Sequence, residues 1–282
     1  MKTNNTAKTS SALLRKMVAP VILASCLFSS ASANAAQIYF NGFETDTAGW
    51  TAPVRVASGT GGITSSDGSF HALADTDFTR WGGYNFGAGA TPTAFQEYTT
   101  SIDIYLDVNG NWANNTRFDF SSAINNAGGT HLSDFIFNGG FYNDATGPGA
   151  NTSRFVFSAS NNSQPGSAFP KNPGRDPIAI SASGWYTFHH RFYDDGGNLA
   201  VDMSILDSSD VVVNDWTLAT AFGIPTVGGN RYGWFDFNEF DRLAIDNSEL
   251  NTAVNGEVPE PATLALLGLG MLGLSFGRRK QH

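Results

Sequence analysis

The chain has 282 residues, among them 16 basic and 25 acidic residues, and a formal net charge of −9 at pH 7. Four of the basic residues precede Gln37 and three follow Pro261, so the segment between them carries a net charge of about −16. Such a surface repels phosphate groups, which excludes nucleic acid and anionic lipid as partners of this segment. Neutral glycans, cations and basic proteins remain, or a charge that serves solubility alone.

The first 36 residues have the three parts of a secretory signal peptide. A polar stretch with four basic residues leads into the apolar run Val18 to Phe28, and small residues follow from Ser29 to Ala36. We expect cleavage after Ala35 or Ala36, so that the mature chain begins near Gln37. The basic residues of the polar stretch are Lys2, Lys8, Arg15 and Lys16.

The segment Leu23-Ala-Ser-Cys26 also resembles a lipobox, in which the cysteine becomes the lipidated first residue of a lipoprotein. Against lipidation, the apolar run continues past Cys26 and a better cleavage site follows it. Cys26 is the only cysteine of the chain, so its loss with the signal peptide would leave neither a disulfide nor a thiolate metal site.

Residues 37–250 show the alternation of β-strands and no long helical period. In Tyr98 to Val108 every second side chain is apolar or aromatic, with Thr100 as the exception, which predicts one buried and one wet face. The run Trp185 to Tyr193 places His190 with the buried aromatic residues and His189 on the other face. Asp194-Asp-Gly-Gly-Asn198 then predicts a hairpin.

The chain continues with strands at Leu199 to Ile205 and Val211 to Leu218, separated by Asp207-Ser-Ser-Asp210, so three strands form a meander. Many short strands with Gly, Asn, Asp and Ser between them predict an all-β fold, an antiparallel two-sheet sandwich in a single domain. The region Gly139 to Pro177 is expected to be a long ordered loop system. The other expected strands are Arg117 to Ser121, Asp134 to Asn138, Arg154 to Ser158, Tyr232 to Phe237 and Arg242 to Asp246.

After a linker at residues 251–257, the last 25 residues have the pattern of a sorting tail. The motif Val258-Pro259-Glu260-Pro261 is extended and accessible, because prolines fix the backbone and remove hydrogen-bond donors. The 15 residues from Ala262 to Phe276 carry no charge, fewer than the roughly 20 that a stable membrane span prefers. Basic residues follow at once, and the positive-inside rule keeps them in the cytoplasm: Arg278, Arg279 and Lys280.

This tail, residues 258–282, resembles the PEP-CTERM sorting domain of exported proteins in Gram-negative bacteria that make extracellular polysaccharide. The resemblance implies recognition by an exosortase, a membrane protease or transpeptidase that acts near Pro-Glu-Pro. Membrane insertion through the short helix would then be transient, and the protein would reach the cell surface or the extracellular matrix. A plain C-terminal membrane anchor behind a rigid spacer is the other interpretation.

The body resembles the concanavalin A-like lectin and glucanase superfamily. The resemblance rests on Gly42 to Trp50 as an opening strand and loop, on the Trp185 to Ile205 hairpin, and on Leu243-Ala-Ile-Asp-Asn247 as a closing strand. It implies a jelly roll of two sheets that binds glycans, sometimes with calcium, or in some members cleaves them. Fold analogy does not decide among these activities.

Catalysis of glycoside hydrolysis needs two carboxylates across one sugar bond. The laminarinase-like branch of the superfamily carries Glu-x-Asp-x-x-Glu or Glu-x-Asp-x-Glu on one strand, and here only Glu239-Phe-Asp241 approaches this pattern. The third acid is missing. We therefore expect a non-catalytic protein that binds extracellular polysaccharide or forms part of its matrix, with a glycoside hydrolase-like enzyme as the alternative.

Sugar-binding faces present aromatic rings to pyranoses and polar groups to their hydroxyls, although most aromatic residues pack in cores. Trp112, in an Asn-rich loop beside Asn111 and Asn114, is the strongest candidate for an exposed ring. The sequence specifies no cofactor with certainty, but acidic loops could supply oxygen ligands to calcium, and the same residues also form turns. The glycan candidates are Trp81, Tyr84, Trp112, Tyr232 and Trp234, and the calcium candidates are Asp75, Asp77, Asp194 and Asp195.

Overall fold

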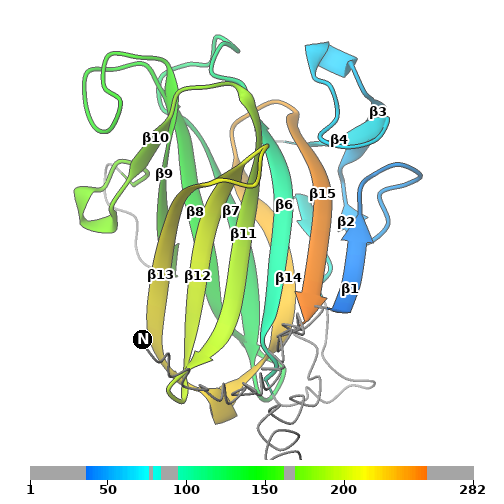
Figure 1. Cartoon of the computed structure of the whole chain (residues 1–282), viewed down its shortest axis with the longest axis vertical. Coiled ribbons are helices and arrows are strands. Elements are labelled where there is room, and N and C mark those ends of the chain that lie inside the picture. The colour runs from blue at the N-terminus through cyan, green and yellow to red at the C-terminus, as the bar shows by residue number, and fades with distance from the viewer. Residues whose placement is uncertain (1–35, 76–78, 84–94, 162–168, 253–282) are drawn as a thin grey trace, which may run out of the picture. The chain divides into compact units, whose positions relative to one another are not determined.

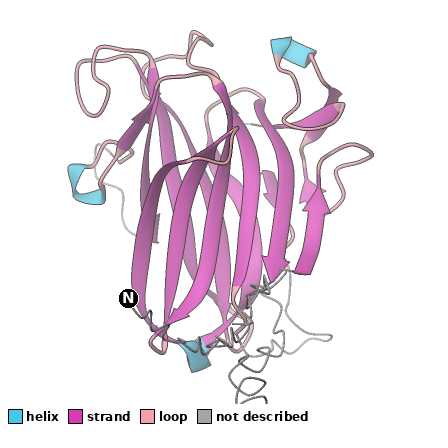
Figure 2. Ribbon diagram, in the orientation of Figure 1, coloured by secondary structure: helices cyan, strands magenta, loops and turns pink. Residues whose placement is uncertain are grey.

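The computed structural model describes residues 36–75, 79–83, 95–161 and 169–252. They form two antiparallel β-sheets packed face to face, with only short 3₁₀ turns besides strands and loops (Figures 1 and 2). The prediction of an all-β antiparallel two-sheet sandwich is confirmed.

Sheet A has eight strands and sheet B has seven, and every neighbouring pair is antiparallel. Sheet A runs in the order β13 (Val212–Gly223), β12 (Asn198–Asp207), β11 (Gly184–Asp195), β6 (Tyr98–Leu106), β15 (Leu243–Thr252), β4 (Phe70–Ala74) and β3 (Val54–Ala57), and β1 (Ala36–Asn41) also pairs with β15. Sheet B runs β10 (Ile178–Ile180), β9 (Arg154–Asn161), β8 (His131–Tyr142), β7 (Thr116–Asn126), β14 (Val227–Asn238), β5 (Thr79–Trp81) and β2 (Trp50–Thr51). The 3₁₀ turns are η1 (Thr60–Gly62), η2 (Pro173–Arg175) and η3 (Ile224–Thr226).

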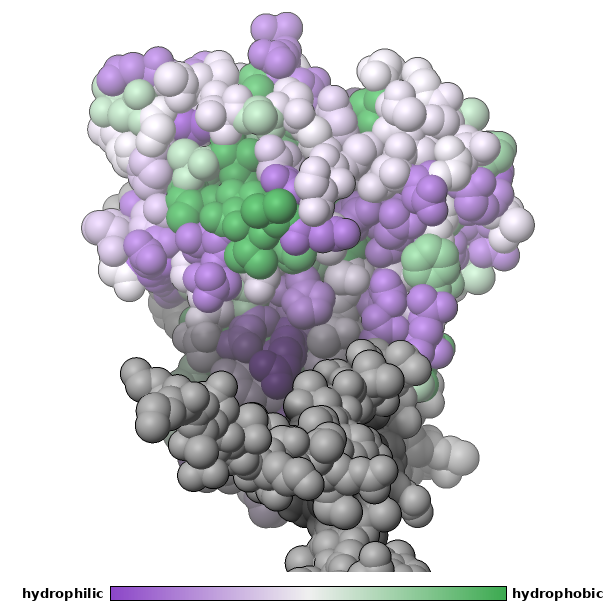
Figure 3. All heavy atoms as spheres, in the orientation of Figure 1, coloured by the Kyte–Doolittle hydropathy of each residue, from purple (hydrophilic) through white to green (hydrophobic). Residues whose placement is uncertain are grey.

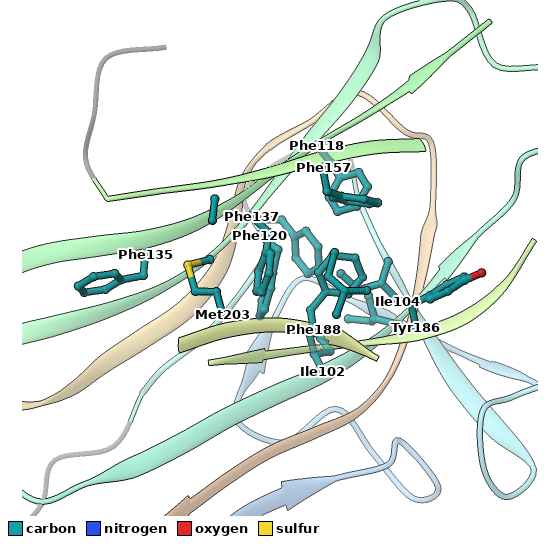
Figure 4. Close-up of a cluster of buried hydrophobic side chains, with 14 of the residues drawn as sticks. Ile102, Ile104, Phe118, Phe120, Phe135, Phe137, Phe157, Tyr186, Phe188 and Met203 are labelled. Carbon is teal, nitrogen blue, oxygen red and sulfur yellow. The ribbon is translucent and has the colours of Figure 1, made fainter. Parts of the chain in front are cut away.

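The core lies between the sheets and is built from the alternating residues that the sequence indicates. On β11, Phe188, His190 and Phe192 are fully buried, while His189 is half-buried on the opposite face. Facing phenylalanines of sheet B complete the cluster, with Phe137 edge-on to Phe188 at 5.2 Å between ring centroids (Figure 4). Rings in such edge-to-face contacts add to the free energy gained by burial alone.

In sheet B, the strands that alternation predicted are longer in the structure than the predicted ranges. Six other strands, from both sheets, have no clear pattern in the sequence. β8 continues to Tyr142 through Gly139 and Gly140, so the loop system expected from Gly139 to Pro177 begins only after Tyr142, and β9 interrupts it. Gly139 lies there because a Cβ atom would come within 2.5 Å of the Phe157 ring. The strands without a clear signal, β1, β2, β3, β4, β5 and β10, have two to six residues each, too few for a period of two to stand out.

The meander β11–β12–β13 is confirmed, and its first turn has the expected chemistry. Asp195 pairs with Asn198, which leaves Gly196 and Gly197 as a two-residue turn with φ values of 63° and 95°. This left-handed backbone suits glycine and matches the strand twist. The Asp194 carboxylate accepts a hydrogen bond from the Gly197 N–H at 2.6 Å and closes the turn.

Strand β13 is an edge of sheet A and starts with exposed valines. Val211, Val212 and Val213 are 58%, 51% and 40% exposed. Figure 3 shows an apolar patch on this face of the molecule, toward the β13 side. An open strand edge with apolar side chains is a template for pairing with another chain.

Four loops lie at the same end of the sandwich, the upper end in Figure 1. They follow β3, β6, β8 and β14 and comprise residues 58–69, 107–115, 143–153 and 239–242. Rigid strands under several neighbouring loops are the common arrangement for a binding site.

In the described ranges, no helix has the length and apolar character needed to cross a membrane. The predicted signal peptide, the linker beyond Thr252, the sorting motif Val258, Pro259, Glu260 and Pro261, the apolar segment, and the basic end Arg278, Arg279 and Lys280 lie outside the described residues.

Candidate functional site

The loop between β6 and β7 holds Trp112 in a fixed position. The Asp107 carboxylate accepts a hydrogen bond from the Asn109 N–H at 2.9 Å, which starts a tight turn. Asn111 follows with a φ of 54°, a conformation that asparagine tolerates. The Trp112 ring then returns over Gly110, where a Cβ atom would come within 2.5 Å of the ring.

Two further contacts fix the half-buried Trp112 ring. Its Nε1 donates a hydrogen bond to the Asp107 carbonyl oxygen at 2.8 Å. One edge of the ring meets Phe240 at a centroid distance of 5.0 Å and an interplanar angle of 80°. The ring therefore has its orientation before any ligand arrives, which lowers the entropy cost of binding.

A cavity of about 330 Å³ lies on one side of Trp112, between the loops that follow β3, β6 and β14. We name it the apolar cavity, because most of its wall is aliphatic or aromatic. Polar groups at its wall come from Thr60, Tyr105, Asp107, Asp241 and Arg242. Its apolar lining residues are Gly61, Ile63, Leu73, Trp112, Phe155, Phe240, Leu243 and Ala244.

A second cavity, of about 320 Å³, also has Trp112 in its wall but is lined by other loops. We name it the asparagine cavity, because its polar lining residues are three asparagines and one serine. The remaining wall is apolar. Its lining residues are Val108, Asn109, Asn111, Trp112, Phe141, Asn143 and Ser153. Both cavities are at the small end of the range of ligand sites in proteins.

Arg154 holds the loop of residues 143–153, which contributes Asn143 and Ser153 to the asparagine cavity. Its side chain is fully buried and donates to the carbonyl oxygens of Asp144, Thr146, Pro148 and Thr152. It also forms an ion pair with the Asp144 carboxylate at 3.2 Å. One guanidinium thus supplies the hydrogen-bond donors for the carbonyl oxygens of a loop that has little secondary structure of its own.

Lys171 binds the same carboxylate from the other side, at 2.7 Å. This hydrogen bond, together with Arg154 and the Thr146 N–H, holds the pKa of Asp144 well below its usual range. Arg175 lies over the Phe169 ring, 4.6 Å from its centroid. The two basic residues of the Phe169–Arg175 segment are thus engaged within the protein.

The loop of residues 58–69, which lines the apolar cavity through η1, is attached to the outer face of sheet A by two aspartates. Asp103 and Asp246 are register partners on β6 and β15. Asp246 accepts from the Ser66 N–H at 3.0 Å, and Asp103 accepts from the Ser66 hydroxyl at 2.6 Å. Burial raises the pKa of Asp246 to about 7, although backbone N–H donors lower it.

Among the other aromatic glycan candidates, the two tryptophans do not present a free ring in this structure. Trp81 and Trp234 are 6% and 4% exposed, and Trp81 packs against Tyr39 at 4.8 Å. Tyr232 is the register partner of Ala123 on β14, but its side chain lies outside the description, as does the whole of Tyr84. Of the aromatic candidates whose side chains are described, Trp112 is the one that lines these two cavities.

The outer face of sheet B, where Trp234 lies, carries buried polar side chains. Asn138 donates to Asp119 at 3.3 Å and accepts from the Ser160 hydroxyl at 2.8 Å. Asn138, Ser158 and Ser160 are at most 3% exposed. These polar groups therefore contribute to the fold, because buried polar atoms must be hydrogen-bonded.

The acidic pair Glu239 and Asp241 is not on a strand, because β14 ends at Asn238. The Glu239 carboxylate accepts the Arg117 N–H at 2.8 Å and so joins the loop to β7. Asp241 reaches the mouth of the apolar cavity with a side chain that is 82% exposed. The two acids thus lack the alternating strand positions of the laminarinase-like motif.

The calcium candidates are separate in the fold. Asp194 uses a carboxylate oxygen in the hairpin turn with Asp195, Asp75 follows β4, and Asp77 is outside the described residues. Within the described ranges, no three His, Cys, Asp or Glu side chains gather as metal ligands. The described calcium candidates therefore supply no shared set of carboxylate ligands.

Sequence reasoning named Trp112 and Asn111 but missed most of the two walls. Asn114 connects loops instead, since its side-chain oxygen accepts the Asn143 N–H at 3.0 Å. The sequence does not mark Tyr105, Asp107 and Phe240 as site residues, because each is only a polar or aromatic residue near the end of a strand. Contacts between loops far apart in the chain decide their place.

Residues 257–280 match the model of the PEP-CTERM protein-sorting motif. The predicted PEP-CTERM motif is thereby confirmed, and it indicates export, sorting at the cell envelope and processing by an exosortase-type partner. No curated protein matches the chain.

Solved structures with a similar fold include three proteins. The first is the CBM2 module of the evolved Dit of Lactobacillus casei BL23 phage J-1, at 12% identity over 78% of this chain and 97% of that chain, with a TM-score of 0.42. The second is the endo-1,3-β-glucanase of Streptomyces sioyaensis, at 10% identity, 78% and 97% coverage and a TM-score of 0.38. The third is lectin I-B4 of Griffonia simplicifolia in its metal-free form, at 10% identity, 80% and 95% coverage and a TM-score of 0.31. At these scores the likenesses carry no functional argument.

Proposed function

We propose that this exported protein is a non-catalytic glycan-binding component of the cell surface or extracellular matrix, and that it binds polysaccharide at the Trp112 site. The observation that supports this most is the position of Trp112. A ring held by Asp107 and Phe240 forms part of the wall of two cavities. Fixed aromatic rings beside asparagine side chains suit the apolar faces and hydroxyls of sugars.

Charge supports a neutral ligand. The asparagine cavity is lined by amides and a hydroxyl, which both donate and accept hydrogen bonds as sugar hydroxyls do. The body around it is acidic, so it would repel a polyanionic glycan.

The test is calorimetric titration of the full chain, kept in a detergent without a sugar headgroup, with neutral polysaccharide from the producing organism. We expect saturable binding that Trp112→Ala weakens at least tenfold, because the ring supplies apolar contact to the sugar. Phe40→Ala is the matched control, since Phe40 is 49% exposed and lines neither cavity. If the folded chain binds no polysaccharide, the glycan-binding function is refuted, and a structural role in the matrix becomes the better explanation.

A glycoside hydrolase is the second candidate, because two carboxylates, Asp107 and Asp241, line the apolar cavity. This function predicts release of reducing ends from the bound glycan. Asp107→Asn and Asp241→Asn would each abolish that release, and Glu239→Gln tests the remaining acid of the sequence pattern. Stable binding without any released sugar refutes it.

A further inference from the structure

We propose that the Trp112 site binds a neutral oligosaccharide carrying an acetamido group, with that group in the apolar cavity and the next sugar ring in the asparagine cavity. The inference rests on the proposed function and specifies its ligand. It comes from the difference between the two walls that meet at Trp112.

The apolar cavity is a poor match for an unsubstituted sugar ring. Its wall is formed mainly by Ile63, Leu73, Phe155, Phe240 and Leu243, none of which can pair with a hydroxyl. A sugar hydroxyl placed there without a partner would lose its hydrogen bonds to water. A methyl group gains from the same wall, so the occupant should carry one.

The polar groups of the apolar cavity match the rest of an acetamido group. Its N–H needs an acceptor, and its carbonyl oxygen needs a donor. Asp107 can accept, because the hydrogen bonds to its carboxylate from Asn109 and Ser183 both go to Oδ1, and no described donor reaches Oδ2. Arg242, whose side chain is 74% exposed at the mouth, can donate.

The asparagine cavity accepts an unsubstituted ring instead. Asn109, Asn111, Asn143 and Ser153 present donors and acceptors without a formal charge. Because Trp112 lines both cavities, one ring of the ligand can contact the indole while its substituent and its neighbour lie on different sides. The ligand must then span at least two sugars.

Buried polar side chains hold two of the loops that form the cavities, so the size of each cavity is set before a ligand binds. Arg154 holds residues 143–153, and the carboxylates of Asp103 and Asp246 hold the loop that includes Ile63. A preformed pair of cavities distinguishes ligands by shape at a low entropy cost.

The experiment compares three trisaccharides on the full chain by titration calorimetry: triacetylchitotriose, its fully deacetylated form, and cellotriose. We expect triacetylchitotriose to bind at least tenfold more tightly than cellotriose, and N-acetylglucosamine alone to bind at least tenfold more weakly than the trisaccharide. The deacetylated form tests whether a positive charge alone attracts the acidic body.

Two variants assign the cavities. Thr60→Trp narrows the apolar cavity from an exposed position on η1 and should weaken triacetylchitotriose binding more than cellotriose binding, so that the preference for the acetylated trisaccharide is lost. Asn143→Ala opens the asparagine cavity from an exposed position and should weaken binding of the trisaccharide more than binding of the monosaccharide. Far-ultraviolet circular dichroism confirms that each variant is folded.

The outcomes separate this inference from the function on which it rests. Equal or tighter binding of cellotriose overturns the acetamido inference and leaves glycan binding in place. Tightest binding of the deacetylated trisaccharide also overturns it, in favour of charge attraction. Binding that does not depend on the number of sugars overturns the two-cavity arrangement. Absence of binding to every neutral glycan, the organism's polysaccharide included, overturns both.

Discussion

Replacement of Arg154 tests whether one buried guanidinium holds the loop beside the candidate site. In Arg154→Met the side chain keeps a similar length but loses its charge and donors. Four carbonyl oxygens and the Asp144 carboxylate then lose a partner, although Lys171 still binds Asp144 at 2.7 Å. Removing one member of a buried ion pair costs about 3–5 kcal/mol.

The loop is partly exposed, and water can reach some of its carbonyl groups, so we expect the lower end of that range. A loss of about 3 kcal/mol corresponds to a Tm lower by roughly 6–12 °C for a domain of this size. Arg154→Lys should lose about 2 kcal/mol, because an ammonium cannot reach all of the acceptors that a guanidinium reaches. The measurement is urea unfolding followed by tryptophan fluorescence.

Arg191→Met is the matched control. Arg191 is 49% exposed in its side chain and pairs with Glu97 at 3.7 Å and Asp202 at 3.4 Å. Exposed pairs of this kind contribute about 0–1 kcal/mol. Arg154 does not hold the loop if the free energy of unfolding of Arg154→Met lies within 1 kcal/mol of that of the unmodified chain. The same conclusion follows if Arg154→Met loses no more free energy of unfolding than Arg191→Met does.

Three further predictions concern pH, the site and the sheet edge. The folded-state pKa of Asp246 is raised to about 7, so between about pH 4 and 7 the folded protein keeps a proton that the unfolded chain releases, and stability falls as the pH rises by up to about 1.4 kcal/mol per unit. The difference in Tm between the unmodified chain and Asp246→Asn should therefore change from pH 5 to pH 7 and stay constant above pH 8; a constant difference throughout contradicts the assignment. Gly110→Ala should displace the Trp112 ring and weaken glycan binding as much as Trp112→Ala while costing only about 1–3 kcal/mol in urea unfolding, and unchanged binding would contradict the fixed ring. Val212→Lys should reduce self-association at high concentration in light scattering, because a charge on the exposed β13 edge opposes strand pairing, and equal association would show that the edge is not the contact.

Local patterns in the sequence determined the long strands, their buried faces and the turn between β11 and β12. Alternation has the period of a strand wherever one face is buried, as in Tyr98 to Leu106, and two glycines after an aspartate satisfy a left-handed turn. The sorting tail is likewise a contiguous motif, and residues 257–280 match it without reference to the body. Strands of two to six residues have too few positions for such a pattern, so β1 to β5 and β10 appeared only in the structure.

The candidate site was decided by tertiary structure. Alternation places Trp234 on the outer face of its sheet, but it cannot tell that this face is covered and the ring 4% exposed. In the same way, Asp103 and Asp246 lie far apart in the chain and meet only because β6 and β15 are neighbours in the sheet. Trp112 was recognisable as an aromatic residue in a polar loop, whereas the walls on its two sides come from loops after β3, β8 and β14. Residue type and period are local properties of a chain, and a cavity exists only where separate segments pack together.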